Sequence, residues 1–512
     1  MQLPPKFPSP SWKSHARCYG LLFASLITAC TAETDASGSG GLDASLMDAT
    51  LEDTGPEPID ARLLEDAAAA DAGDTDARVN SGRFAMRVVT SGLAAPWEVA
   101  WGPDAQLWIT ERTGKRVSRV DPETGAKTVL LALDDAYQAS PQDGVLGLVL
   151  HPRWSPGREF VYVAYTYDAN PSEAVDRRAR IARYRYDGAT LVEPLVLLEA
   201  LPASGDHNAG RLAFGPDDAL YYAIGDQGKN QLSLKCQAIR AQDVPSQVAV
   251  DTHDFSTYQG KVLRIALDGA IPQDNPVIAG VRSHVFTYGH RNAQGLAFGP
   301  DGSLFAAEQG PKTDDELNLL LPGRNYGWPY VAGLRDDAAY VYGDWSAASD
   351  CAALDYSDYA FPSSVPQYAE SSWSADDFTA PLRTFYTVAT GYEFMDPACE
   401  PSPYICWPTI APSSLAIYMG TGIPGWTNSL LLTSLKDGAV HRLRLNARGD
   451  GVEGDDELWF DTTNRYRDLA IAPDGTTFYI ATDATGDTRA PDGKPTQALE
   501  HPGAILEFRY LP

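Results

Sequence analysis

The chain has 512 residues, and its formal net charge of −28 argues against nucleic acid as a partner, because surfaces that bind nucleic acid are basic. Aromatic residues make up 10% of the sequence, which also contains 44 glycines and 37 prolines. This composition favours a turn-rich β protein, and the length is sufficient for a large core.

The N-terminus has the pattern of a bacterial export signal. Cationic residues precede an apolar run over 21–27 that is too short to span a bilayer comfortably. The run ends in Ile27-Thr-Ala-Cys30, which resembles a bacterial lipobox. The resemblance predicts a signal peptide over 1–29 and a lipid anchor on Cys30, and Thr31 after it favours the outer membrane. The alternative is an ordinary secretory signal in which Cys30 is incidental. Either reading predicts an exported protein, in the periplasm or on the cell surface.

An acidic segment follows, predicted over 30–80. Residues 31–78 contain 13 Asp or Glu and two Arg, a net charge of −11, and almost no aromatic residues. A segment of this composition cannot bury enough apolar surface to fold. We therefore predict a solvated tether between the anchor and the body of the protein.

The body, predicted over 82–512, repeats one strand–turn–strand pattern. Copies begin at Val99, Leu212, Leu296 and Leu469, and a degenerate copy begins at Leu148. In the four clear copies a Pro-Asp turn joins two apolar strands, since Pro presets φ and the residues after it tolerate a positive φ. Helical periodicity is nearly absent. Repeated units of this kind predict an all-β, six-bladed β-propeller with long loops.

Export also affects how the remaining cysteines are interpreted. Cys236, Cys351, Cys399 and Cys406 are an even number in an oxidising compartment, and no Cys-x-x-Cys pair indicates zinc. Cys399 and Cys406 enclose a short proline-rich loop and are the expected disulfide. Cys236 and Cys351 would then pair by elimination, and the sequence leaves that second bridge open.

Two histidines are candidates for proton transfer. Asp206 precedes His207 just ahead of a repeat strand, and a neighbouring carboxylate can orient an imidazole or raise its basicity, so His207 is a candidate general base. His290 is a second candidate, but the adjacent Arg291 disfavours its protonation. The alternative for each is a hydrogen-bonded structural histidine.

Cations and acids gather in two further places. Arg465 and Arg467 share one face of a strand and, with Lys436, suit an anion carrying several carboxylates or phosphates; solvated or acid-paired arginines are the alternative. The segment 289–336 begins with a cation and two amides: Arg291, Asn292 and Gln294. Its later part offers oxygen ligands that suit Ca²⁺, or simple solvation, at Asp314, Asp315, Glu316 and Asp336.

A series of motifs, in the order of the family and at nearly its spacing, resembles the soluble PQQ-dependent glucose dehydrogenase family, also called the glucose/sorbosone dehydrogenase group. These motifs are Gly205-Asp-His207, Ile224-Gly-Asp-Gln-Gly-Lys-Asn-Gln-Leu232, Gly260-Lys-Val-Leu-Arg264, Gly289-His-Arg-Asn292, Glu308-Gln-Gly-Pro311, Asn325-Tyr-Gly-Trp-Pro329, Cys406-Trp-Pro-Thr409, Ser434-Leu-Lys436 and Asn464-Arg-Tyr-Arg-Asp468. The resemblance extends over roughly 85–512, and the family fold is a six-bladed propeller. It implies oxidation of a glucose-like aldose at C1 to the lactone, with PQQ and Ca²⁺ as cofactors and an external electron acceptor.

The resemblance also implies roles for individual residues. His207 would be the general base, oriented by Asp206, which with Gln142 would hold the sugar; Arg291 and Asn292 would contact the quinone oxygens. Further cofactor contacts would come from Thr409, Lys436, Arg465 and Arg467. The sugar cleft would be lined by Leu232, Tyr404 and Trp407. The carbonyls of Gly310 and Pro311 would hold the Ca²⁺ beside PQQ. Other calcium ligands would be Glu316, Tyr326, Ala332, Leu334, Asp336 and Glu370.

Some features depart from the family pattern. Leu334 replaces a common Tyr, Cys236 and Cys351 are extra cysteines, and residues 343–370 differ in sequence and length. The lipobox and acidic tether are additional, and the sequence leaves the physiological sugar open. Two other functions remain open: a non-catalytic propeller that binds carbohydrate or protein, and a calcium-dependent lactonase. The sequence also leaves open a homodimer.

Overall fold

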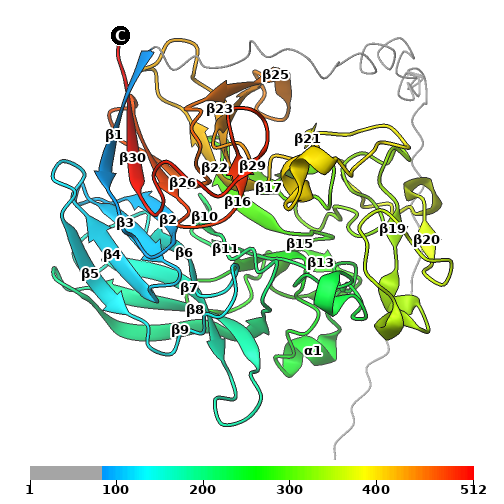
Figure 1. Ribbon diagram of the computed structural model, residues 1–512. Helices are drawn as coiled ribbons and strands as arrows, with labels where there is room; N and C mark the ends of the chain where they lie inside the picture. Colours follow the sequence, from blue (N-terminus) through cyan, green and yellow to red (C-terminus); the bar gives the residue numbers. More distant parts are fainter. Residues whose placement is uncertain (1–82) are drawn as a thin grey trace, which may run out of the picture. The chain divides into compact units, whose positions relative to one another are not determined.

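The computed structural model describes residues 83–512, which contain six four-stranded antiparallel sheets (Figure 1). Five sheets are formed by strands in sequence order, whereas the sixth combines three C-terminal strands with the first strand, β1. This arrangement confirms the predicted six-bladed propeller. The predicted signal peptide (1–29), the lipidated Cys30 and the tether (30–80) lie outside the described residues.

The strands of the six blades are as follows. Blade 1 contains β2 (Pro96–Trp101), β3 (Leu107–Glu111), β4 (Arg116–Val120) and β5 (Lys127–Ala132). Blade 2 contains β6 (Val145–Leu150), β7 (Phe160–Asp168), β8 (Arg177–Tyr186) and β9 (Leu191–Pro202). Blade 3 contains β10 (Leu212–Phe214), β11 (Leu220–Ile224), β12 (Lys261–Ile265) and β15 (Val285–Tyr288). Blade 4 contains β16 (Ala293–Phe298), β17 (Leu304–Glu308), β18 (Asp315–Leu320) and β21 (Arg383–Phe385). Blade 5 contains β22 (Pro412–Tyr418), β23 (Ser429–Ser434), β24 (Val440–Leu445) and β25 (Val452–Trp459). Blade 6 contains β26 (Tyr466–Ile471), β27 (Thr477–Thr482), β30 (Ile505–Tyr510) and β1 (Phe84–Thr90).

The loops carry only short elements. Three two-stranded pairs are β13 (Val277–Ile278) with β14 (Val281–Arg282), β19 (Tyr342–Gly343) with β20 (Gln367–Tyr368), and β28 (Thr488–Arg489) with β29 (Pro495–Thr496). The described residues contain one short α-helix, α1 (Gln247–Asp251), and 3₁₀ turns η4 (Leu232–Leu234), η5 (Trp345–Ala347), η6 (Cys351–Ala353), η7 (Glu370–Ser372), η8 (Pro397–Cys399) and η9 (Pro403–Ile405). Among those residues, no helix is long and apolar enough to cross a membrane.

The sequence repeats are the first two strands of five blades. In the four clear copies the residue after Pro-Asp has a positive φ: 56° at Ala105, 61° at Asp218, 88° at Gly302 and 64° at Gly475. These values confirm the predicted turn chemistry. Blade 5 lacks the motif, because a longer connection over 419–428 joins β22 to β23.

The strand β1 closes the ring of blades by pairing with β30, which Figure 1 shows alongside it. The register places Phe84 opposite Tyr510, and the two rings are 5.4 Å apart. Phe84 also packs edge-on against Trp459 of the neighbouring blade 5, at 5.7 Å. The N-terminal strand therefore joins blade 6 to blade 5 through an aromatic cluster, in addition to its hydrogen bonds.

A buried ion cluster connects three blades near their inner strands. Arg211, just before β10, lies 2.6 Å from a Glu98 oxygen on β2 and 3.2 Å from an Asp468 oxygen on β26. Its guanidinium also stacks 4.3 Å over the Trp97 ring. Burial of one cation with two carboxylates links blades 1, 3 and 6.

Both disulfides form. Cys399 is bonded to Cys406, as the proline-rich loop between them predicts. Cys236 is bonded to Cys351, so the pairing that the sequence left open is present. The second bridge joins two loops separated by 115 residues.

Blade 5 contains a buried histidine held between two carboxylates. His441 on β24 lies 2.6 Å from Asp456 through Nδ1 and 3.0 Å from Asp437 through Nε2. Burial opposes protonation of this ring, but the two carboxylates outweigh burial and raise the pKa of His441 to about 10. The protonated ring then donates to both partners.

This cluster predicts a loss of stability at alkaline pH. The folded-state pKa exceeds that of the unfolded chain, so the stabilisation is complete below about pH 6.5 and disappears as the pH rises through about 10. We expect the melting temperature to fall by about 3–6 °C more in the wild type than in His441→Gln between pH 7 and pH 10. Calorimetry on both proteins checks this, and equal slopes would contradict it.

Candidate active site

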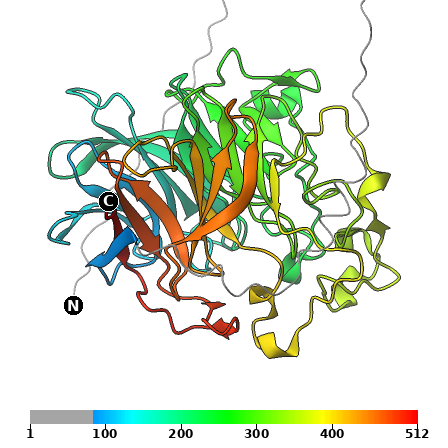
Figure 2. The same ribbon diagram turned by 90° about the horizontal axis from the view of Figure 1, so that it is seen from above.

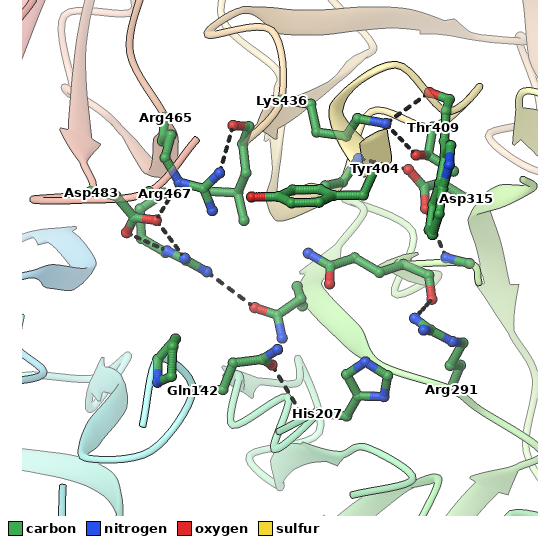
Figure 3. A pocket seen from close by; sticks show the side chains of 18 of the residues that line it. Gln142, His207, Arg291, Asp315, Tyr404, Thr409, Lys436, Arg465, Arg467 and Asp483 are labelled. Atoms are coloured by element: carbon green, nitrogen blue, oxygen red, sulfur yellow. Dashed lines mark hydrogen bonds and ion pairs between the residues drawn. The ribbon is translucent and has the colours of Figure 1, made fainter. Parts of the chain in front are cut away.

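One cavity of about 430 Å³ is lined by residues from the connections of all six blades (Figure 3). Because neighbouring strands are antiparallel, the loops that follow the second and fourth strands of each blade lie at the same end of the ring. Nearly all lining residues come from those loops. Figure 3 shows Gln142, His207 and Arg291 on one side of the cavity, with Arg465, Arg467 and Lys436 facing them.

His207 presents one ring nitrogen to this cavity. The side chain is buried, and its Nδ1 lies 2.7 Å from Asp226 Oδ1. Asp226 is itself fixed, because Trp328 Nε1 donates to its other oxygen at 2.8 Å. A carboxylate at Nδ1 holds the proton on that nitrogen and leaves Nε2 free to accept another.

The orienting carboxylate is therefore Asp226, and the expectation that Asp206 has this role is wrong. Asp206 Oδ1 lies 3.7 Å from His207 Nε2, on the side where a substrate would sit. His207 has a left-handed φ of 43°, and in this conformation its Nδ1 is directed to Asp226 while Asp206 lies near Nε2. The pattern Gly-Asp-Gln over 225–227 contains Asp226, but its spacing from His207 gave no signal.

Three polar side chains surround Nε2 of His207. Gln142 donates to Asp206 Oδ1 through a short bond, and Gln231 donates to Asp206 Oδ2 at 2.9 Å. Gln231 Nε2 also lies 3.4 Å from His207 Nε2, and Arg291 donates to Gln231 Oε1 at 3.4 Å. Burial opposes ionisation of Asp206, but His207 and Arg291 outweigh it and lower its pKa. Gln231 thus joins the site, although the sequence singled out only its neighbour Leu232.

The Arg291 side chain lines the cavity and has a hydrogen-bond donor without a partner. One guanidinium nitrogen donates to the Gln309 carbonyl at 3.1 Å, and the group lies 5.4 Å from the Trp328 ring centroid. Its Nε is buried without a hydrogen-bond partner. An unsatisfied buried donor facing a cavity indicates that a ligand acceptor belongs there.

Asn292 lies behind the cavity wall instead of on it. The residue is fully buried, and its amide donates to Gln309 Oε1 at 3.1 Å and accepts from Gln294 at 3.0 Å. Gln294 and Gln309 are the amides that line the cavity. The structure therefore gives Asn292 a supporting position, in contrast to the expected direct contact with a cofactor.

The cavity lining as a whole carries a surplus of positive charge, and we call Lys436, Arg465 and Arg467, which lie opposite His207 in Figure 3, the cationic wall. Five cations line the cavity against two carboxylates, Asp315 and Asp483, a surplus of three. The cations are Arg112, Arg291, Lys436, Arg465 and Arg467. In a chain of net charge −28, such a surplus indicates a ligand with several negative charges.

Arg465 and Arg467 share one carboxylate, as Figure 3 shows. Arg467 binds Asp483 through two nitrogens at 2.9 and 2.7 Å, and Arg465 Nε donates to the same group at 3.2 Å. Burial opposes ionisation of Asp483, but the arginines outweigh it and lower its pKa to about 2. Tyr466 between them is buried in the core, which confirms the predicted alternation. The acid pairing considered as an alternative exists, but it neutralises only one of the two arginines.

Lys436 and Thr409 meet at the far end of the cavity. The Lys436 ammonium donates to Thr409 Oγ1 at 2.6 Å and to the Trp407 carbonyl at 2.7 Å. Burial lowers the pKa of Lys436 and raises that of the neighbouring Asp315. An anionic ligand would favour the charged ammonium. The predicted grouping of Lys436, Thr409, Arg465 and Arg467 around one space is present.

Two of the three residues expected in the sugar cleft line the cavity. Tyr404 and Trp407 do so, and Tyr404 is fixed by a 2.7 Å bond from its hydroxyl to Asp487. Leu232 does not line the cavity; its side chain is 61% exposed. The reason is its positive φ of 46°, which points the loop outward at that position.

The expected calcium ligands divide into two groups. Gly310 and Pro311 line the cavity. In the second group, Glu370 accepts the backbone N–H groups of Ala332, Asp336 and Asp337 at 3.0, 3.2 and 3.0 Å, so Ala332, Leu334, Asp336 and Glu370 occupy one small region. Glu316 adjoins it by accepting from Gly333. Tyr326 is set apart, because its hydroxyl donates to Leu319 and its ring stacks on His290.

His290 is not available as a base. It is completely buried, with Nδ1 2.8 Å from Glu308 and Nε2 2.8 Å from the Thr287 hydroxyl. Both ring nitrogens are occupied, and the residue does not line the cavity. The structural alternative is correct for this histidine.

Comparisons with known proteins agree on one group. The family model described as Glucose / Sorbosone dehydrogenase matches residues 93–378 and 386–489. Quinoprotein glucose dehydrogenase B of Acinetobacter calcoaceticus is 43% identical over 85% of this chain and 92% of its own. Aldose sugar dehydrogenase YliI of Escherichia coli K12 is 24% identical over 78% and 91% of the two chains. The PQQ-bound aldose sugar dehydrogenase of Streptomyces coelicolor superposes with a TM-score of 0.55 at 26% identity, over 83% of this chain and 98% of that one.

Proposed function

Because this chain belongs to the glucose/sorbosone dehydrogenase family and is a PQQ-dependent sugar dehydrogenase, we propose that it oxidises a pyranose aldose at C1 to the lactone, with His207 as the base. The observation that carries this proposal is the arrangement of His207 opposite the cationic wall. A base held by Asp226 at Nδ1 faces a cavity whose lining as a whole has three surplus positive charges.

The cavity fits PQQ in charge and in hydrogen bonding. PQQ carries three carboxylates, which equal the cationic surplus of the lining, and Arg291, whose buried Nε has no partner, would donate to a quinone oxygen. Lys436, Arg465, Arg467 and Thr409 would hold the carboxylates. When bound, PQQ supplies the two-electron acceptor for the hydride that leaves C1 of the sugar.

The side chains perform the proton transfer and the positioning. His207 Nε2 accepts the proton of the anomeric hydroxyl, and Asp226 stabilises the imidazolium that results. Asp206, Gln142 and Gln231 supply an acceptor and donors for the sugar hydroxyls next to that nitrogen. Arg291 would place positive charge next to the quinone oxygens, where negative charge develops as the quinone is reduced. Tyr404 and Trp407 provide apolar surface for the pyranose ring.

Calcium belongs to the proposal as well. Carbonyl and carboxylate oxygens on irregular backbone are the ligands that Ca²⁺ prefers. Gly310 and Pro311 would hold one ion beside the cofactor, and Glu370 with Ala332, Leu334 and Asp336 would hold another. Burial raises the pKa of Glu370 to about 7, and a cation beside it would favour the ionised form.

Export and lipid anchoring rest on the sequence of residues 1–80 alone. We propose that the mature chain begins at Cys30 and is anchored there by lipid, with the acidic segment as a tether. Incorporation of labelled palmitate into the full-length protein, and its loss in Cys30→Ser, tests the anchor. Equal labelling of both proteins would refute it.

The activity is tested by reconstitution. We expect the purified apoprotein to reduce an artificial dye with aldoses only when both PQQ and Ca²⁺ are added, and to lose activity when a chelator removes calcium before PQQ is added. A panel of aldoses would identify the preferred sugar. If no aldose supports dye reduction although PQQ binds, the proposed reaction is wrong. Acid release from gluconolactone without PQQ would indicate a lactonase instead.

A further inference from the structure

The segment over 343–370, where the sequence departs from the family pattern, packs on the loop that follows β11. Its β19–β20 pair lies to one side of the blades in Figure 1, and the yellow-green part of Figure 2 extends beyond the sheets at the same side. The core of this segment is aromatic, with Trp345 buried against Tyr356 at 5.2 Å and Phe361 at 6.2 Å. The segment is therefore a packed unit and not a loose loop.

A disulfide and two hydrogen bonds attach this segment to the loop over 226–240. The Cys236–Cys351 disulfide is covalent. Asn230 donates from Nδ2 to the Gly343 carbonyl at 2.8 Å and accepts at Oδ1 from Ser346 N at 3.1 Å. Both ends of one buried side chain are thus satisfied by the segment. We call this set of contacts the brace.

The residue next to Asn230 touches the reacting groups. Gln231 lies 3.4 Å from His207 Nε2, donates to Asp206 at 2.9 Å and accepts from Arg291 at 3.4 Å. Among residues 229–240, no other side chain makes a hydrogen bond or ion pair with these three groups. A shift of the backbone at 230 would therefore displace the partner of the base directly.

The loop also needs external support. Asn230 has φ of 61° and Leu232 has φ of 46°, so Gln231 stands between two left-handed residues. Leu tolerates this region poorly, and Leu232 is 61% exposed, which leaves little packing to offset the strain. Strained backbone persists only where surrounding contacts fix it, and the brace supplies those contacts.

A buried lysine outside the brace fixes the other side of the segment. Lys312 follows Pro311 of the cavity wall, and its buried ammonium donates to the Asp358 carbonyl. The same ammonium lies 5.7 Å from the Phe361 ring centroid and 5.0 Å from that of Phe394. The segment is thereby joined to two further loops of the site, and the space left between them is only about 50 Å³.

We propose that the segment over 343–370 is a positioning element for the catalytic base, and that the Cys236–Cys351 disulfide and Asn230 transmit its position to Gln231. This inference rests on the proposed role of His207. Gln231 is held with its amide between Asp206 and His207 only while Asn230 is clamped by the segment. The disulfide is covalent, so the brace holds even when the strained loop fluctuates.

Two variants test the brace by different routes. Cys236→Ser/Cys351→Ser removes the covalent link, and Asn230→Gly keeps the positive φ while it removes both side-chain bonds. Asn230→Asp is the matched control, because it keeps an acceptor for Ser346 N and tolerates the same φ. Each is measured as PQQ- and Ca²⁺-loaded protein for kcat and KM with an aldose, for the Kd of PQQ, and for hydrogen exchange at 226–240.

We expect kcat/KM to fall about tenfold in the first two variants, with a smaller fall in Asn230→Asp. The Kd of PQQ should stay within about twofold of the wild type, because none of these residues contacts the cationic wall. Exchange should accelerate over 226–240 and remain unchanged in blade 2.

The outcomes are separable. Unchanged exchange in both variants would overturn the brace itself. Faster exchange with unchanged kcat/KM would overturn its positioning role. Wild-type protein that binds PQQ but oxidises no aldose would refute the proposed function, and the exchange data would still decide whether the segment holds the loop.

Discussion

Replacing His207 with Gln is expected to lower kcat by about 10³-fold, because it removes the acceptor for the proton of the anomeric hydroxyl. Gln is close to His in size and keeps a polar group towards Asp226, so the cavity should retain its shape. The Kd of PQQ should not change, since His207 lies opposite the cationic wall. Steady-state kinetics with a saturating aldose and a PQQ titration measure the two quantities.

Two further variants make this result specific to one histidine. Asp226→Asn should also lower kcat, by about 10²–10⁴-fold, because an amide no longer fixes the Nδ1 proton and no longer stabilises the imidazolium. His151→Gln is the control, since His151 lies outside the cavity at the end of β6. A His207→Gln protein with normal turnover would show that another group accepts the proton.

Removing one cation from the wall is expected to weaken PQQ binding strongly. Arg467→Met should cost about 2–4 kcal/mol, or ~30–1000-fold in Kd, because it deletes a buried charge that faces the ligand. Lys436→Met should have an effect of similar size, since its ammonium is held at the cavity by Thr409 and the Trp407 carbonyl. Difference absorbance or fluorescence quenching on the apoprotein measures the Kd.

The matched control for these variants is Arg442→Met. Arg442 is also a buried arginine, paired with Glu457 at 2.6 Å, but it lies outside the cavity. Its loss should lower the melting temperature without changing the Kd of PQQ. Equal Kd values in all three variants would show that the cationic wall does not hold the cofactor.

Much of the fold could be predicted from local sequence, because each repeat carries its own turn chemistry. The Pro-Asp turns after Trp101, Phe214, Phe298 and Ile471 identify the first two strands of four blades. Blade 5 could not be identified in this way, since its first hairpin has a longer connection without the motif. The closure by β1 was also invisible, because it depends on a pairing between residues 84–90 and the C-terminal strand.

The site was predictable where chemistry is local in sequence. The alternation of Arg465 and Arg467 placed both on one face, and the structure brings them to Asp483. Asp226 could not be assigned in this way, since it lies 19 positions after His207 in the sequence, beyond the two strands β10 and β11. The adjacency of Asp206 to His207 suggested that Asp206 orients the ring, but Asp206 lies near Nε2 and the orienting contact at Nδ1 is made by Asp226.

The positions of Gln231 and Asn292 could not be predicted from the sequence, for two different reasons. Gln231 lies in a motif but has no charge and no periodicity to mark it, and only the folded loop brings it to His207. Asn292 follows Arg291 in sequence, yet successive residues of an extended chain point to opposite sides. One of the pair therefore lines the cavity and the other is buried behind it.

The central claim is that PQQ in this cavity oxidises an aldose with His207 as the base. The most direct measurement mixes the PQQ- and Ca²⁺-loaded protein with one equivalent of aldose, without oxygen or dye, and follows the absorbance of the bound cofactor in a stopped-flow instrument. We predict rapid loss of the oxidised spectrum with one equivalent of lactone formed in the wild type, and a loss about 10³-fold slower in His207→Gln. An unchanged spectrum in the wild type, or equal rates in the two proteins, would contradict the account.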